Sequence, residues 1–261
     1  MRSTFLKTTL SIATAALLTV SCTKEIAQKS YPSEITLDNW EAFVDAPEEL
    51  LQQLKANHPV EAVKPYAPKS IPPAIKIDDK DKAFCHHGKV TIWNGSYWSG
   101  LGFVKIDYLH ITTYSADPSG KYALVNLGNH PICMTYPGST GVGGGGSLNV
   151  LDIVMTQRHI LGIQTFEQLD IDQAPRRYVA ADVVDDGVIN SLDIDKMVAI
   201  ILGTNTAPTL DIAYVSTSKL KLSVVTDPAQ LSGGIKDNCN TPPGLTIRAI
   251  KMGDVTGDNI L

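Results

Sequence analysis

A stretch of hydrophobic residues at helical spacing occurs twice in the chain. Residues 148–162 and 189–203 each have asparagine at the second position, continue as an apolar stripe and end in glycine. In the second copy Ile194, Val198 and Ile201 lie three or four positions apart, which predicts one apolar face on a helix. A glycine directly after such a stripe is typical of a helix C-terminus. We therefore expect two short helices that bury their stripes against each other.

The two copies align at a constant offset of 41 residues. Seven pairs between these two stretches keep the same amino acid at this offset: Asn149 and Asn190, Leu151 and Leu192, Asp152 and Asp193, Ile153 and Ile194, Ile160 and Ile201, Leu161 and Leu202, and Gly162 and Gly203. A repeat that keeps particular residue types at particular positions is one structural unit used twice. Each copy is predicted to be a loop followed by a helix.

Shorter hydrophobic runs with β-branched and aromatic residues predict strands on both sides of this repeat. The predicted strands are Lys89–Trp93, Leu101–Ile106, Lys121–Asn126 and Leu245–Ile250. The last of them is expected to join a sheet formed by residues 209–226. A short helix after Asp45 and an extended proline-rich linker at 58–75 are predicted before the first strand.

These elements predict an α+β multidomain protein in which a small β-sandwich is followed by a paired loop-helix module and a C-terminal β segment. The expected parts are a signal segment at 1–21, a tether with a short helix and linker at 22–83, the β-sandwich at 84–137, the repeat pair at 138–207 and the C-terminal β segment at 208–261.

Composition excludes several classes of function. The chain has 43% hydrophobic and 19% charged residues, which excludes a disordered protein. It carries 22 basic and 27 acidic residues, a net charge of −5, and no basic block, so nucleic acid is not an expected partner. The motifs of metalloproteases, serine hydrolases and P-loop enzymes are absent from the sequence. We expect a protein that is not an enzyme.

The N-terminus has the pattern of a bacterial export signal. Arg2 and Lys7 precede an uncharged apolar run, Thr8–Val20, which is too short to span a bilayer as a helix. Ser21 and Cys22 then resemble the lipobox of bacterial lipoproteins, with Thr19 where that family usually has Leu. The resemblance implies cleavage before Cys22, a lipid on its thiol, and anchoring to the bacterial cell envelope at the outer membrane. An ordinary secretory signal is the alternative.

Export permits disulfides, and the cysteine count limits them. With Cys22 lipidated, Cys85, Cys133 and Cys239 remain, so at most one internal bridge forms and one thiol is left over. The sequence does not choose the pair.

The loop before the second helix has the spacing of a calcium site. Asp182–Asp193 is twelve residues long and has Gly187 at the sixth position, where an EF-type loop turns sharply. Ca²⁺ prefers six to eight oxygen ligands. The predicted ligands are Asp182, Asp186, the carbonyl of Val188, Asn190 and Asp193.

This loop and helix resemble the dockerin repeat, in which a "D-x-N-x-D-G-x-V-N-x-x-D" loop runs directly into one helix. The resemblance implies bound Ca²⁺ and a docking face for a cohesin-like or other envelope protein. Val184 departs from the pattern, because it stands at the third position, where a ligand oxygen is expected. An acidic helix-capping turn that binds nothing is the alternative.

The first repeat has no carboxylate in its loop before Asp152, because Gly141–Gly146 occupy the first six positions. We expect no Ca²⁺ there. The glycines also match G-x-G-x-x-G, but no parallel βαβ unit follows, so a dinucleotide site is not predicted. Asp186→Ala is expected to abolish a Ca²⁺-dependent rise in melting temperature, and Asp152→Ala to leave it unchanged.

The C-terminal residues offer a second strip of oxygens. Asp254, Thr256 and Asp258 occupy the first, third and fifth positions of another loop, and residues 250–259 resemble the "K-I-G-D-V-N-G" ending found after such repeats. No later residue supplies the twelfth position. The strip is expected either to fray from Asn259 onward or to lie against another element.

The β region carries a second resemblance and an aromatic cluster. Residues 88–90, 102–104 and 115–122 resemble small sandwich domains related to the regulatory domain of carboxypeptidases, which implies a spacer or adhesion module. Trp93, Tyr97 and Trp98 lie in one predicted hairpin, where aromatic rings either pack on the turn or stack on a sugar.

Together these features predict a non-enzymatic, lipid-anchored envelope protein with a Ca²⁺-binding dockerin-like module, acting in assembly of polysaccharide-degrading or adhesion complexes. One alternative is a carbohydrate-binding accessory lipoprotein that uses the three aromatic residues. The other is an unrecognised polysaccharide hydrolase, since paired carboxylates need not be close in sequence.

Overall fold

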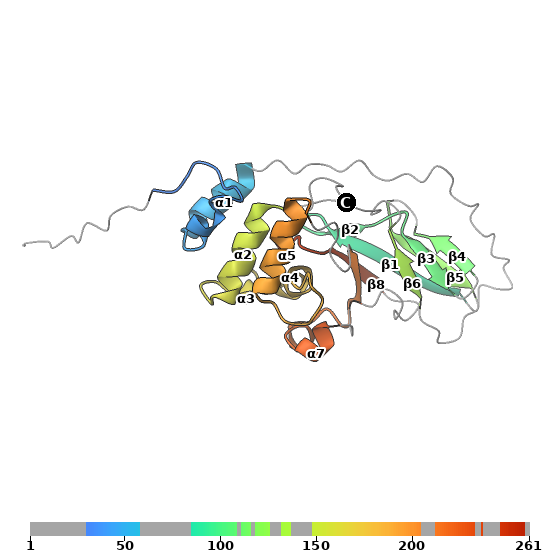
Figure 1. Cartoon of the computed structure of the whole chain (residues 1–261). Coiled ribbons are helices and arrows are strands. Elements are labelled where there is room, and N and C mark those ends of the chain that lie inside the picture. Colours follow the sequence, from blue (N-terminus) through green and yellow to red (C-terminus); the bar gives the residue numbers. More distant parts are fainter. Residues whose placement is uncertain are drawn as a thin grey trace, which may run out of the picture. The chain divides into compact units, whose positions relative to one another are not determined.

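The computed structural model describes most of the chain after the N-terminal segment (Figure 1). The described residues are 30–57, 85–108, 111–115, 118–125, 132–136, 148–204, 212–232, 236 and 246–258. The predicted signal, Cys22, the proline-rich linker and the glycine-rich stretch 141–147 lie outside them. No helix among the described residues is both long and apolar enough to cross a membrane.

A five-stranded sheet is built around β1 (Cys85–Trp93). One edge of β1 pairs antiparallel with β5 (Lys121–Val125) and β2 (Trp98–Gly100). The other edge pairs in parallel with β8 (Thr246–Lys251), which pairs antiparallel with β7 (Ile212–Ser216). The C-terminal strand therefore joins the predicted partner and also the earlier β region, so the two β segments form one sheet.

A three-stranded antiparallel sheet has the order β4 (Ile111–Tyr114), β3 (Lys105–Tyr108), β6 (Cys133–Thr135). Buried side chains from both sheets form one hydrophobic cluster, with Val90 and Ile247 from the large sheet and Ile106 and Met134 from the small one. Cys133 is one partner of a disulfide.

The repeat forms the two expected helices, α2 (Val150–Ile160) and α5 (Ser191–Ile201), which lie side by side (Figure 1). Both begin with a capping box. In each, an asparagine side chain accepts a hydrogen bond from the first turn of the helix, and the backbone N–H of that asparagine donates to the carboxylate of the aspartate three residues later. Thr156 Oγ1 lies 4.0 Å from Met197 Sδ, and these residues are equivalent in the repeat. The two copies therefore cross where equivalent positions face each other, as a local two-fold relation requires.

Four shorter helices complete this half of the molecule: α3 (Phe166–Leu169), α4 (Ala174–Ala181), α6 (Leu222–Val225) and α7 (Pro228–Leu231). Their apolar residues share a core cluster with α2 and α5 and with Ala213 and Ile250 of the large sheet. Helices and sheet are thus packed together by burial of apolar surface, which is the main favourable term in folding.

An N-terminal segment covers the outer face of α2. Its elements η1 (Trp40–Phe43) and α1 (Glu48–Asn57) bury Phe43 and Leu51 in a cluster with Leu151 and Val154 of α2. Arg158 Nη1 donates to the carbonyls of Val44 (3.1 Å) and Ala46 (2.7 Å), which fixes the segment further.

The α+β class is confirmed, but some expected details are wrong. Leu222–Val225, expected in a sheet, forms α6, and the run predicted as a strand from Leu101 becomes a strand only at Lys105. By their contacts, residues 31–261 form one compact unit. The reason is that β1 and β8, distant in sequence, pair within one sheet.

Candidate metal centre and its counterpart loop

The predicted calcium loop, residues 182–193, connects α4 to α5 and is here called the second-repeat loop. Asp182 follows the last residue of α4, and Asp193 lies in the first turn of α5. The carboxylate of Asp193 accepts one hydrogen bond from the backbone N–H of Val184 and one from that of Asn190, each 3.0 Å long. Asp193 therefore ties the start of the loop to the start of the helix.

The carboxylate of Asp182 closes the sharp turn of the same loop. It accepts hydrogen bonds from the backbone N–H groups of Asp186 (3.2 Å) and Gly187 (3.0 Å). Gly187 has φ of 82°, and a Cβ there would collide with the carbonyl oxygen of Pro228 in α7. Glycine is required here on both conformational and steric grounds.

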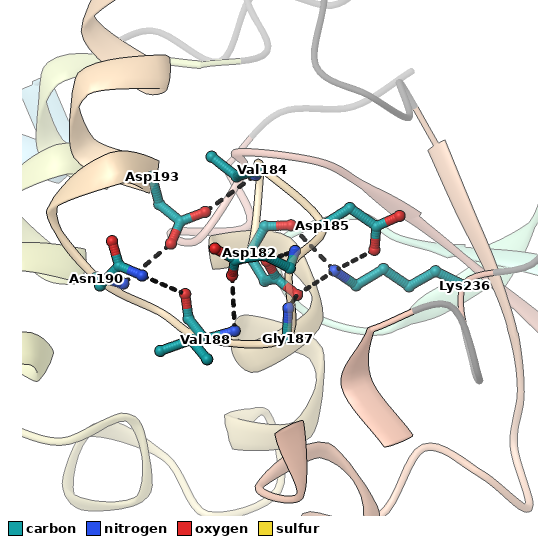
Figure 2. Close-up of polar contacts among 9 residues, drawn as sticks. Asp182, Val184, Asp185, Gly187, Val188, Asn190, Asp193 and Lys236 are labelled. Carbon is teal, nitrogen blue, oxygen red and sulfur yellow. Dashed lines mark hydrogen bonds and ion pairs between the residues drawn. The ribbon is translucent and has the colours of Figure 1, made fainter. Parts of the chain in front are cut away.

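A lysine that sequence analysis did not single out reaches into this loop. Lys236 Nζ lies 2.6 Å from Asp182 Oδ2, 3.0 Å from the Asp182 carbonyl oxygen and 3.0 Å from Asp185 Oδ1 (Figure 2). The first two contacts are hydrogen bonds, and the third is an ion pair without the alignment of a hydrogen bond. The side chains of Lys236 and Asp182 are both fully buried.

The other predicted ligands are engaged in bonds within the loop. The Val188 carbonyl accepts from Asn190 Nδ2 at 3.1 Å, and the exposed Asp186 accepts from the Val188 N–H at 2.9 Å. Val184 offers no side-chain oxygen at the third position. The structure thus brings the predicted residues together, but internal donors use their oxygens.

The C-terminal strip lies against the first repeat. After β8, Gly253 N donates to the Ala180 carbonyl at 2.8 Å, and Asp254 and Thr256 are buried. Thr256 N then donates to Asp152 Oδ1 at 2.8 Å. Of the two expectations for this strip, the described residues 254–258 follow the second, because they lie against another element, and Asp152 of the first repeat supplies a carboxylate at the closing position.

The strip and the first helix together reproduce the second-repeat loop. Asp152 accepts from Asn149 N and from Thr256 N, as Asp193 accepts from Asn190 N and from Val184 N. The fourth residue of each strip has a positive φ, 64° at Asp185 and 74° at Gly257. Residues 254–258 therefore stand in for the first five loop positions that the first repeat lacks. We call residues 149–152 and 254–258 the composite loop.

Three carboxylates of the composite loop surround one hydroxyl. Thr256 Oγ1 lies 2.7 Å from Asp258 Oδ1, 2.8 Å from Asp152 Oδ1 and 3.4 Å from Asp254 Oδ1. A hydroxyl has a single hydrogen, so Thr256 can donate to only one of the three carboxylates at a time. Oxygen atoms of the three aspartates lie within 4.8 Å of one another, as in a group that could hold a metal ion.

Burial and mutual repulsion make this group costly without a cation. Burial, and then the charges of Asp254 and Asp258, raise the pKa of Asp152 well above its ordinary value. Two cationic side chains are nearby, but both donate to backbone carbonyls of the strip: Arg176 Nη1 to Asp254 (2.6 Å) and Lys55 Nζ to Thr256 (2.9 Å). The carboxylates accept hydrogen bonds from the backbone N–H groups of Asn149, Thr256 and Gly257 and from Asn149 Nδ2. These donors are neutral, so they do not offset the negative charges of the three aspartates, which lie close together.

The aromatic hairpin supports the composite loop instead of presenting a flat surface. The rings of Trp93 and Trp98 meet edge to face with centroids 5.7 Å apart, and Arg248 lies 4.2 Å over Trp98. A Cβ at Gly257 would collide with the Trp93 ring. Of the three aromatic residues only Tyr97 is largely exposed, at 63%.

Comparison with known proteins assigns no relative to this fold or site. No family model matches the chain, and neither a curated protein nor a solved structure matches it. The two loops are therefore the features of this chain from which a function can be inferred.

Proposed function

We propose that this protein is a non-enzymatic, lipid-anchored component of the bacterial cell envelope whose dockerin-like repeat pair is clamped by one Ca²⁺ in the composite loop. The observation that carries the proposal is the crowding of Asp152, Asp254 and Asp258 around the hydroxyl of Thr256. Anchoring through Cys22 rests on the sequence resemblance alone.

The donor set of the composite loop suits a hard cation. Carboxylate and hydroxyl oxygens are the ligands that Ca²⁺ prefers, and Asp254, Thr256, Asp258 and Asp152 supply them at the first, third, fifth and twelfth loop positions. A divalent ion would neutralise the repulsion among these carboxylates, two of which are buried. It would also tie the C-terminal strip to α2, which sets the geometry of the repeat pair.

Thermal unfolding with Ca²⁺ and with a chelator tests the proposal directly. A ligand that binds only the folded state stabilises it by RT ln(1 + [L]/Kd), about 2.7 kcal/mol at a hundredfold excess over Kd. Asp258→Asn should abolish the rise in melting temperature. Asp186→Asn changes the residue at the same position of the second-repeat loop and should leave the rise intact.

An unchanged melting temperature in the unmutated protein, at millimolar Ca²⁺ and after removal of residual metal, would show that the carboxylate group is not a calcium site. In that case protonation of Asp152 would relieve its repulsion from Asp254 and Asp258. The composite loop would then hold the C-terminal strip against α2 without a metal ion.

A docking partner is the second part of the proposal. Leu161, Leu192 and Leu202 of the repeat pair are exposed at 56%, 55% and 58%, and large apolar side chains on a docking face would serve a cohesin-like or other envelope protein. Pull-down from envelope fractions with the unmutated protein, and with Leu192→Glu and Leu202→Glu together, tests this. Equal recovery by both proteins counts against docking through this face.

A further inference from the structure

The second-repeat loop contains a cation that belongs to the protein itself. Lys236 Nζ contacts a carboxylate oxygen and the carbonyl oxygen of Asp182 and a carboxylate oxygen of Asp185, and both Lys236 and Asp182 are fully buried (Figure 2). A buried ammonium is tolerated only when oppositely charged and polar groups compensate it. Two carboxylates and one carbonyl do so here.

The oxygens left for a calcium ion in this loop are too few. Ca²⁺ takes six to eight oxygens, whereas Val184 supplies none at the third position. The carbonyl at the seventh position, Val188, accepts from Asn190 Nδ2, and Lys236 binds a carboxylate oxygen of Asp182 at the first position. The residues present therefore do not fit the metal that the resemblance to dockerin repeats implies.

The position of Lys236 is fixed by its surroundings. The chain reaches Lys236 shortly after α7, and the Pro228 carbonyl of α7 packs against the turn at Gly187 with no room for a side chain there. The same turn of the loop is thus bordered by α7 and held by Lys236 through Asp182. An entering metal ion would have to displace a buried ion pair and meet the ammonium charge at Asp182.

We infer that the ammonium of Lys236 is the resident cation of the second-repeat loop, so this loop closes without metal and excludes Ca²⁺. The chain then holds two versions of one loop. The composite loop has the oxygens of a calcium site, and the second-repeat loop has a lysine that compensates Asp182 and Asp185.

Isothermal titration with CaCl₂ in the Asp258→Asn background tests this inference separately from the proposed function, because the composite loop is then disabled. Residues 23–261 of this variant should take up no Ca²⁺. Uptake that a further Asp182→Asn substitution abolishes would place Ca²⁺ in the second-repeat loop and overturn the inference.

Two substitutions in that background should convert the loop. Val184→Asp restores a carboxylate at the third position, and Lys236→Met removes the ammonium while keeping an unbranched chain. Val184→Asp alone should bind no Ca²⁺, because Lys236 still holds the site. The two substitutions together should bind one Ca²⁺ per chain and raise the melting temperature on its addition.

Two results would contradict the assignment of Lys236 as the resident cation. One is Ca²⁺ binding by the Val184→Asp protein with Lys236 in place. The other is a doubly substituted protein that has the near-ultraviolet circular dichroism of the parent and binds no Ca²⁺. If the double variant does not fold, the Val184→Asp protein alone still decides, because it keeps the buried ion pair.

Discussion

The two copies of the repeat solve one electrostatic problem in different ways. Each collects aspartates at the start of a helix, where the backbone N–H groups and the helix dipole favour negative charge. In the second-repeat loop Lys236 compensates Asp182 and Asp185 directly. In the composite loop the three carboxylates face Thr256, and the nearby cationic groups bind carbonyls instead. The two loops therefore share their hydrogen-bond pattern but differ in how the negative charge of their aspartates is compensated.

Removal of the internal cation should have the largest effect on stability. Lys236→Met leaves Asp182 as an uncompensated buried charge, which typically costs about 3–5 kcal/mol. Urea unfolding in the presence of a chelator measures the loss. Lys121→Met, at an exposed lysine of β5, is the control and should change the free energy of unfolding by less than about 0.5 kcal/mol. Equal effects of the two substitutions would show that the ion pair contributes nothing.

The second-largest expected effect is a difference in stability between equivalent leucine substitutions on α2 and α5. Leu151 is 1% exposed beneath the N-terminal segment, whereas its counterpart Leu192 is 55% exposed. Leu151→Ala should cost about 2–5 kcal/mol, as for other buried leucines. Leu192→Ala should change stability by less than about 0.5 kcal/mol. The same urea titration compares them, and similar losses would mean that the N-terminal segment does not cover α2 in solution.

In the absence of Ca²⁺, stability should fall as the pH rises from about 4 through about 6. Burial raises the pKa of Asp193 to about 6 and that of Asp152 well above its ordinary value. The folded state then holds these protons more tightly than the unfolded chain, so their stabilising effect is complete at low pH and is lost as each group ionises. The shift of Asp193 corresponds to at most about 3 kcal/mol.

Urea unfolding across this pH range, with chelator present, measures that slope. Asp193→Asn removes one of the two titrating groups and should flatten it. Added Ca²⁺ should reduce the contribution of Asp152, since the ion requires the ionised carboxylate. A slope that Asp193→Asn leaves unchanged would assign the pH dependence to other groups.

The closing aspartates should separate the two loops by their response to Ca²⁺. Asp152→Asn is expected to abolish the stabilisation by Ca²⁺, about 2.7 kcal/mol at a hundredfold excess over Kd, and with it the rise in melting temperature. Asp193→Asn should lower the melting temperature but preserve the rise. Differential scanning calorimetry with and without Ca²⁺ distinguishes them. This order is the reverse of the one that the sequence predicts, in which the calcium response depends on Asp186 and not on Asp152.

The helices and the second-repeat loop could be predicted because their determinants are local. A constant offset, the pairs Asn149/Asp152 and Asn190/Asp193, and a glycine after each helix define both repeats, and the capping boxes follow from them. The same local pattern led to the expectation of Ca²⁺ beside Asp182. It contained no sign of Lys236, which arrives from 54 residues away.

The composite loop was missed for a related reason, although a signal existed. Thr256 and Asp152 are 104 residues apart, and spacing rules apply only within a continuous loop. The C-terminal strip has the first, third and fifth positions without the twelfth, and the first repeat has the twelfth without the others. Each fragment supplies the loop positions that the other lacks. This match could have predicted that the two fragments form one loop.

The route of the chain through β8 has a practical consequence for anyone wishing to transplant the repeat pair. This strand runs in parallel with β1 and delivers residues 254–258 to the first helix, while Lys236 comes from the stretch before it. A fragment cut at residues 138–207 would lose half of one loop and the counter-charge of the other. The smallest fragment that keeps both loops intact therefore extends to Asp258 and includes the large sheet.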